Sequence, residues 1–180
     1  MDKRDLEQLL SDVAGGAVTP ADALTRIQTA PTADLGFAQL DLSRGVRQGA
    51  GEVVYGAGKT ADQIAAIIEA LRDAGQERIL VTRLDAEKAA RTAELLGNGI
   101  DLGYVPDAQL ALVGGKPSPT GNGRIVVACA GTSDLPVAEE AALTAEFYGN
   151  EVDRLYDVGV AGLHRLLAHA EELAQAQVVI

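Results

Sequence analysis

The stretch RIVVACAGTSDLPVAEEAALTAEFYGNEVDRLYDVG, residues 124–159, decides the fold. Continuous apolar runs bounded by turn residues predict buried strands, and the apolar spacing between them predicts a helix. Alternating strands and helices are typical of parallel strands joined by right-handed crossovers. The elements expected from residue 125 onward are a strand (Ile125–Ala130), a turn (Gly131–Asp134), a helix (Pro136–Tyr148), a strand (Val152–Tyr156), a helix (Ala161–Leu173) and a strand (Val178–Ile180).

The sequence stops within the apolar run at Val178–Ile180. Domains rarely end on a buried strand, and a parallel sheet this narrow is thin for an α/β domain. We therefore expect this second domain to be incomplete. The alternative is a minimal domain in which Val178–Ile180 forms a final edge strand.

A Gly- and Pro-rich segment, GGKPSPTGNG at 114–123, precedes this region and has the composition of a linker. We expect an N-terminal domain over residues 1–113, a linker over 114–122 and the second domain over 123–180. The elements expected in the first part are helices around Leu6–Val13, Ala21–Ile27, Thr60–Gly75 and Asp85–Leu96, a strand at Arg78–Thr82, and loops with short or mixed strands at 36–58 and 103–113.

Composition bounds the class of protein. The chain has 180 residues, 47% of them apolar and 23% charged, which is enough for a real core. The net charge of −11 excludes a general basic footprint, so we expect no nucleic-acid partner and no anionic membrane surface. Charges scattered through MDKRDLEQLL argue against a signal peptide, and the short apolar runs argue against a membrane span. One Cys excludes a disulfide framework and a multi-thiolate zinc site, so a cytoplasmic protein is expected.

The segment GAGKT at Gly56–Thr60 suggests a phosphate loop, but its spacing differs from one. The P-loop needs Gly five residues before its Gly-Lys pair, and Val53 stands there. No clear buried strand precedes the segment either. Lys59 beside Tyr55 could still bind an anion with the first amides of the following helix. An ordinary turn capped by Thr60 is the favoured interpretation of the residues alone.

The turn GTSD follows the first parallel strand and precedes a helix. Ligands of open α/β sheets bind in this position, where amide N–H groups and the helix dipole favour phosphate. Gly131, Thr132, Ser133 and Asp134 are therefore candidate phosphate-binding residues, and a purely capping turn is the alternative.

A His-Arg pair follows the second parallel strand. Parallel strands bring their following loops to one sheet edge, so we expect His164 near Ser133 and Asp134. His164 is a candidate proton-transfer residue and Arg165 a candidate anion-binding residue. No metal site is predicted, because His169 lies five residues on and does not share a face with His164. Two further features have structural explanations: Cys129 as a small buried hydrophobe and Glu139-Glu140 as a solvated helix edge.

Three segments together resemble the LarB family: DLSRGVRQGAGEVVYGAGKT (41–60), AGTSDLPVAEEAALTAEFYG (130–149) and YDVGVAGLHRLL (156–167). The family makes pyridinium-3,5-biscarboxylic acid mononucleotide for a nickel-pincer cofactor. The C-terminal part also resembles the aminoimidazole ribonucleotide carboxylase (PurE) domain. The resemblance implies a small α+β N-terminal domain followed by a partial PurE-like, flavodoxin-like, three-layer α/β domain.

The resemblance implies carboxylation of the pyridinium ring of nicotinic acid adenine dinucleotide and hydrolysis of its phosphoanhydride. Carbon dioxide or bicarbonate is the co-substrate, AMP a product, and Mg²⁺ is allowed; no tightly bound cofactor is implied. His164 would be the catalytic base by analogy with PurE. Gly131, Thr132, Ser133, Asp134, Arg165, Lys59 and Tyr55 would bind substrate or phosphate. Assembly into a homo-oligomer through the PurE-like domain is also implied.

The family attaches the ring transiently to a cysteine, which makes C5 nucleophilic. That cysteine belongs to a segment beyond the third PurE-like strand, where this sequence has stopped, and Cys129 does not match it. We therefore expect these 180 residues to be inactive on their own. The alternatives are a PurE-type carboxylase of purine biosynthesis and a non-catalytic nucleotide-binding module.

Overall fold

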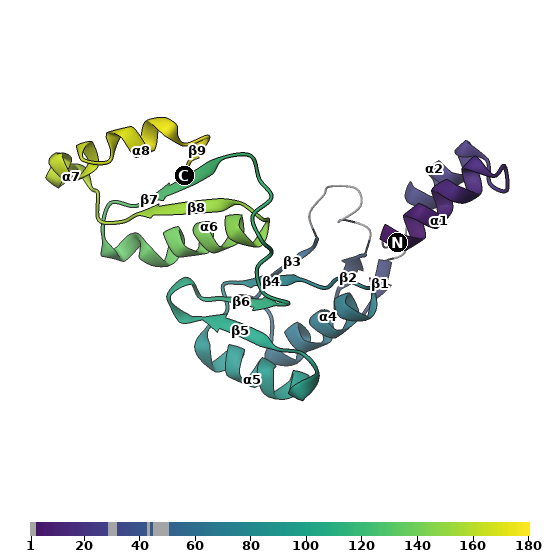
Figure 1. Ribbon diagram of the computed structural model, residues 1–180. Helices are drawn as coiled ribbons and strands as arrows, with labels where there is room; N and C mark the ends of the chain where they lie inside the picture. The colour runs from purple at the N-terminus through teal and green to yellow at the C-terminus, as the bar shows by residue number, and fades with distance from the viewer. Residues whose placement is uncertain (1–2, 29–31, 43, 45–50) are drawn as a thin grey trace.

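The computed structural model describes residues 3–28, 32–42, 44 and 51–180 (Figure 1). It combines helices with parallel and antiparallel strands, which confirms the expected α/β class. The helices are α1 (Lys3–Ala14), α2 (Pro20–Gln28), α4 (Ala61–Asp73), α5 (Ala86–Leu96), α6 (Leu135–Phe147), α7 (Leu163–Leu167) and α8 (Ala170–Gln175), with short helical turns η1 (Gly97–Gly99), η2 (Pro106–Ala108), η3 (Thr132–Asp134) and η4 (Val160–Gly162). The strands are β1 (Thr32–Asp34), β2 (Gln39–Asp41), β3 (Val53–Tyr55), β4 (Ile79–Thr82), β5 (Leu102–Val105), β6 (Leu110–Val113), β7 (Arg124–Ala128), β8 (Glu151–Leu155) and β9 (Val178–Val179).

The first sheet has the strand order β3-β4-β6-β5. Strands β3 and β4 are parallel and are joined through α4, whereas β6 is antiparallel to both β4 and β5. Alternate residues of β4 face opposite sides: Ile79 and Val81 pack with α4 and α5, and Leu80 packs on the other face. Both faces are buried, which explains why ILVT reads as an uninterrupted apolar run.

The second sheet has the order β8-β7-β9, and both pairings are parallel. The expected parallel pairing of Ile125–Ala130 with Val152–Tyr156 is therefore confirmed. The central strand β7 connects to β8 through α6 and the chain then returns through α7 and α8 to β9 on the other side. This is the order in which a flavodoxin-like sheet begins, with its switch point between β7 and β9.

Helix α6 lies between the two sheets (Figure 1). On one side, Ala138 and Ala142 pack against Val127 of β7. On the other side, Leu143 and Phe147 pack with buried side chains of the first sheet and η2, namely Leu80, Ala108, Leu110 and Leu112. Helical layers and sheets thus alternate, from α4 and α5 at the bottom of Figure 1 to α7 and α8 at the top.

The single helix expected over Ala161–Leu173 is wrong. Two short helices, α7 and α8, are separated at Ala168 and His169, and the backbone leaves helical geometry at His169 (φ −104°, ψ 15°). Leu166 of α7 and Leu173 of α8 both pack on the outer face of the second sheet, in the cluster that contains Val126.

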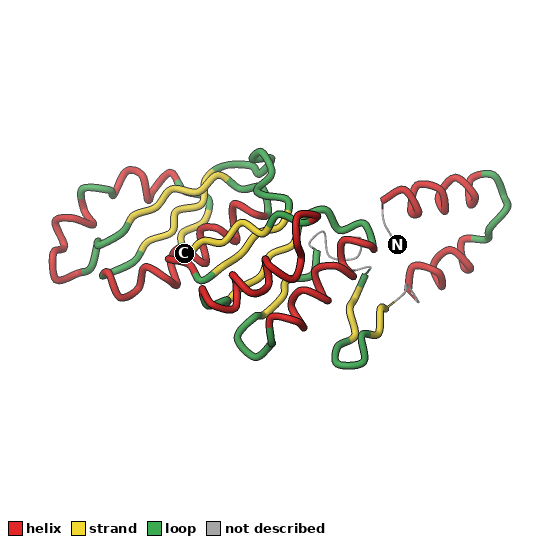
Figure 2. The backbone as a smooth tube through the Cα atoms, turned by 90° about the horizontal axis from the view of Figure 1, so that it is seen from below, coloured by secondary structure: helices red, strands yellow, loops and turns green. Residues whose placement is uncertain are grey.

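Two hairpins make up the N-terminal region. Helices α1 and α2 form an antiparallel pair, and β1 and β2 form an antiparallel ribbon. Figure 2 shows the helical pair beyond the ribbon, at the end of the molecule away from the second sheet.

Candidate functional site at the carboxyl ends of the parallel strands

The GTSD turn lies where the sequence placed it, after β7 and before α6. The Asp134 carboxylate accepts the Gly131 N–H at 3.0 Å, and the Asp134 N–H donates to the Gly131 carbonyl at 3.0 Å. Thr132, Ser133 and Asp134 are exposed. Asp134 therefore closes the turn on itself, while the hydroxyl groups of Thr132 and Ser133 remain at the surface of the sheet edge.

The loop after β8 packs directly on the loop after β7. The Val158 N–H donates to the Cys129 carbonyl, and the Gly159 N–H donates to the Ala130 carbonyl at 3.0 Å. A Cβ at position 159 would lie 2.8 Å from that same carbonyl oxygen, so only glycine fits. The two loops therefore share one edge of the second sheet, as parallel pairing requires.

His164 and Arg165 lie at the start of α7. The Arg165 guanidinium is paired with the Asp157 carboxylate, and Asp157 has a left-handed backbone with φ 57°. His164 is exposed, and within the described residues no hydrogen bond joins its ring to the GTSD turn. The sheet edge is shared, but direct contact between His164 and Ser133 stays a prediction.

Cys129 is buried, at 8% exposure, among Val127, Ala138 and Ala142. Its Sγ lies 3.8 Å from the Gly131 carbonyl oxygen. The side chain thus faces α6 rather than solvent.

The GAGKT segment follows a short strand. β3 precedes it and is parallel to β4, and such short strands were expected within residues 36–58. Only Val54 of β3 is fully buried, so β3 is not the clear buried strand that leads into a P-loop. Thr60 caps α4 as expected, in a capping box with Gln63.

The lysines around this loop are held by its backbone. Lys59 Nζ donates to the Tyr55 carbonyl at 3.0 Å, and Lys88 Nζ donates to the Gly56 carbonyl at 3.1 Å. Gly56 sits against β4, where its N–H donates to the Thr82 carbonyl at 2.7 Å and an added Cβ would lie 3.0 Å from that oxygen. Tyr55 is 59% exposed beside the loop.

An ion-pair chain between α6 and β8 was not expected from the sequence. Arg154 donates to Glu139 at 3.1 Å and to Glu146 at 2.6 Å; Glu139 also accepts the Tyr156 hydroxyl, and Glu146 accepts Lys116. Burial and the hydrogen bond to Glu139 raise the pKa of Tyr156 above its ordinary value. Glu139 is therefore no solvated edge.

Glu140 also differs from the expectation, since it pairs with Arg83, which follows β4 of the first sheet, at 2.7 Å. The signal for both pairs was available but weak: oppositely charged residues lay on neighbouring predicted elements, and no spacing rule identified which would meet.

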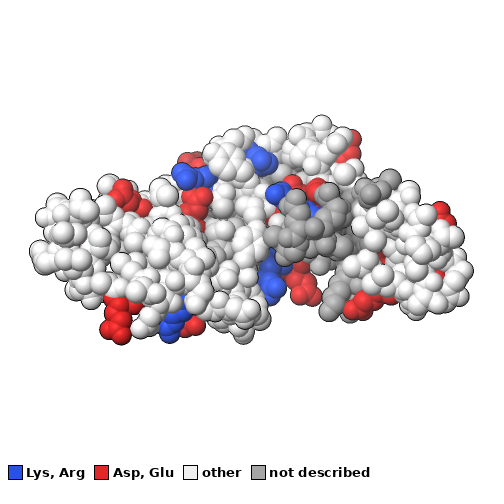
Figure 3. Space-filling model, turned by 90° about the horizontal axis from the view of Figure 1, so that it is seen from above, with Lys and Arg blue, Asp and Glu red and all other residues white. Residues whose placement is uncertain are grey.

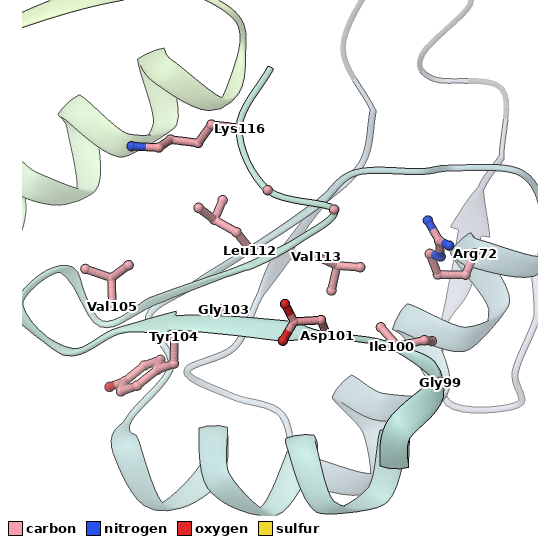
Figure 4. Close-up of a pocket in the computed structure, with 12 residues that line it drawn as sticks. Arg72, Gly99, Ile100, Asp101, Gly103, Tyr104, Val105, Leu112, Val113 and Lys116 are labelled. Carbon is pink, nitrogen blue, oxygen red and sulfur yellow. The ribbon is translucent and has the colours of Figure 1, made fainter. Parts of the chain in front are cut away.

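A depression of about 450 Å³ lies away from these loops, at the free edge of the first sheet (Figure 4). Its polar residues do not converge. Lys116 extends toward α6 and pairs with Glu146, Arg72 donates to the Glu77 carbonyl, and Tyr104 points away and donates to the Leu84 carbonyl. We assign no site there.

Neither the distribution of surface charge nor the arrangement of possible metal ligands identifies a further site. On the face shown in Figure 3, acidic and basic side chains form small separate groups rather than a field of one sign. Within residues 3–28, 32–42, 44 and 51–180, no group of three or more His, Cys, Asp or Glu could hold a metal ion. No helix in this part of the chain is long and apolar enough to cross a bilayer.

Comparison with known proteins follows the same division of the chain. Residues 32–114 match the family model described as a LarB/PurE-like N-terminal domain. An uncharacterized protein of Methanocaldococcus jannaschii is 33% identical over 142 residues, which make up 78% of this chain and 56% of that relative. The chain thus spans about half the length of the curated relative that it matches. The family match confirms the resemblance read from the sequence.

Proposed function

Residues 32–114 belong to the LarB/PurE-like N-terminal domain family, and from this premise we propose that the chain takes part in carboxylating the pyridinium ring of nicotinic acid adenine dinucleotide. Carbon dioxide adds at C5, the C5 proton leaves, and water cleaves the phosphoanhydride to release AMP. The observation that carries the proposal is the GTSD turn after the central strand of a parallel β8-β7-β9 sheet. Such a turn at a switch point is where open α/β sheets bind phosphate.

Each residue of this edge has a role in the proposal. Thr132 and Ser133 donate hydroxyl hydrogen bonds to a substrate phosphate, and Asp134 keeps the turn closed through the Gly131 N–H. Arg165 supplies positive charge, held in place by Asp157. His164, exposed at the same edge, takes the C5 proton.

The GAGKT loop lies at the carboxyl end of the other parallel pair, β3 and β4. In the proposal, Lys59 and the exposed Tyr55 ring contact the rest of the dinucleotide. Among the described residues, no group of three or more His, Cys, Asp or Glu could hold a metal ion, and we assign no step to Mg²⁺. Association of several copies through the second sheet also belongs to the proposal and rests on the family resemblance.

The nucleophilic thiolate has no candidate among the described residues. Cys129, the only cysteine of the sequence, is buried against α6. We propose that these 180 residues bind substrate and do not form the carboxylated product by themselves.

The test is calorimetric titration with AMP. Ser133→Ala should weaken AMP binding by about 1–3 kcal/mol, because a hydrogen bond to a charged phosphate is lost. Ser118→Ala, an exposed serine in the 114–123 segment, is the matched control and should bind like the wild type. Unchanged affinity in Ser133→Ala would assign the turn to helix capping alone.

A further inference from the structure

A second, apolar groove of about 350 Å³ lies between the two sheets. Its floor is one face of α6, formed by Val137, Ala141 and Thr144 at helical spacing. Arg83, which follows β4, forms one wall, and Ile180, at the end of β9, forms the other. The groove therefore opens at the carboxyl ends of strands from both sheets.

Backbone hydrogen bonds connect each wall to one candidate loop. Arg83 follows Thr82, whose carbonyl accepts the Gly56 N–H of the GAGKT loop at 2.7 Å. The Ile180 carbonyl accepts the Ala128 N–H at 2.8 Å, directly before the segment that leads into GTSD. Pockets of this kind, at a domain interface and a switch point, are the usual positions of small-molecule sites.

Arg83 is the cationic group of the groove, and its backbone is unusual. Its φ is 53°, a left-handed conformation that costs a non-glycine residue free energy and is common at functional sites. The Arg83 side chain is 46% exposed, and its ion pair with Glu140 joins Nε to a carboxylate oxygen at 2.7 Å. A guanidinium has five N–H donors in a planar fork that matches a carboxylate, so most of its donors lie outside this contact.

We propose that this groove binds a flat heteroaromatic ring carrying a carboxylate. The ring packs on Val137 and Ala141, and the carboxylate binds Arg83 in competition with the Glu140 carboxylate, which already occupies one edge of the guanidinium. This proposal rests on the proposed function: the ring that binds the groove is the nicotinate part of the dinucleotide. Arg83 is then a specificity-determining residue for the nicotinate carboxylate.

Because the ligand carboxylate and Glu140 compete for Arg83, substitutions at Arg83 and at Glu140 should change the nicotinate affinity in opposite directions. In NMR titrations with free nicotinate, Arg83→Gln should weaken binding about tenfold or more, because a charge-assisted pair is lost. Glu140→Gln should tighten binding several-fold, because the competing carboxylate is gone. Nicotinamide, which is neutral, should bind the wild type about tenfold more weakly than nicotinate.

Arg91→Gln is the matched control, since Arg91 lies on α5 in an exposed pair with Glu94. It should leave nicotinate binding unchanged. Ala141→Leu keeps both Arg83 and Glu140 but fills the floor of the groove, so it should abolish nicotinate binding. This variant tests the groove independently of whether Arg83→Gln folds.

A purely structural ion pair would give a different pattern. If Arg83→Gln and Glu140→Gln shift the affinity in the same direction, or if nicotinamide binds as well as nicotinate, the proposal is overturned. AMP titration of the same variants separates the two proposals. If Ser133→Ala weakens AMP binding but Arg83→Gln leaves nicotinate binding unchanged, only the groove proposal is overturned. If Arg83→Gln weakens nicotinate binding but Ser133→Ala leaves AMP binding unchanged, only the role of the phosphate turn is overturned.

Discussion

Cys129 illustrates how a strand position sets the reactivity of a side chain. Residues of the second sheet alternate between the two faces, and Cys129 follows Val127 onto the face covered by α6. An apolar environment excludes both solvent and reagents from the thiol. The sequence was sufficient for this conclusion, because RIVVACAG is a buried-strand pattern with no thiolate-stabilising neighbour.

Cys129 should react slowly with a thiol-reactive dye in the native protein. The expected rate is at least about tenfold below that in strong denaturant, because the thiol is reached only by local opening. The sequence has one cysteine, so the labelling signal has a single source. Equal native and denatured rates would show an accessible thiol and would reopen Cys129 as a nucleophile.

Glu146 is the most constrained carboxylate of the ion-pair chain. Burial alone would raise its pKa, but hydrogen bonds from Arg154 and Lys116 outweigh burial and hold the pKa below the ordinary 4.5. A carboxylate with a depressed folded pKa stabilises the protein above its unfolded pKa. That stabilisation is lost as the pH falls through the folded value.

Arg154→Met should lower the free energy of unfolding by about 1–3 kcal/mol near neutral pH, since Glu139 and Glu146 each lose a charge-assisted hydrogen bond and keep one other partner, Tyr156 and Lys116 respectively. The difference from wild type should shrink as the pH falls below the ordinary carboxylate range. Urea unfolding at several pH values measures this. Arg91→Met, which breaks only an exposed pair on α5, should cost less than about 0.5 kcal/mol; an equal cost in both variants contradicts the account.

Helix α6 is the element that connects the two halves of the described molecule. LPVAEEAALTAEF is apolar around most of its circumference, as expected of a helix covered on both sides. The sequence predicted the helix to within one residue at each end, but the Asp134 side chain closes the GTSD turn instead of capping α6. It did not predict the second contact surface, because small and apolar residues on every face do not say which neighbour covers which face.

Leu143→Ala should destabilise the protein by about 2–4 kcal/mol, because it opens a cavity between α6 and the first sheet. Amide-exchange protection should fall in β4 as well as in β7, since both sheets depend on this helix. Leu167→Ala, at a position 61% exposed on α7, is the control and should cost less than about 0.5 kcal/mol. Loss of protection in β4 alone would mean that the sheets unfold independently.

At the scale of the whole molecule, local patterns were enough to predict most of the elements and the parallel second sheet. The strand-turn-helix order around GTSD fixed that sheet, because parallel strands need crossovers. Two kinds of feature escaped. The break between α7 and α8 has no signal in the apolar pattern, because Leu166 and Leu173 would share one face of an unbroken helix. The groove at Arg83 exists only because two sheets share α6. Contacts between one helix and two separate sheets leave no periodic pattern in the sequence that identifies the partners.

The most direct test of the central claim is amide chemical-shift mapping of the protein with nicotinic acid adenine dinucleotide. If the carboxyl ends of the parallel strands bind this dinucleotide, shifts should concentrate in residues 55–60, 83–85, 131–134 and 157–165. The amide chemical shifts of the depression lined by Arg72, Asp101 and Lys116 should stay unchanged, so this depression serves as an internal control. Shifts confined to that depression, or none at saturating dinucleotide, would contradict the account.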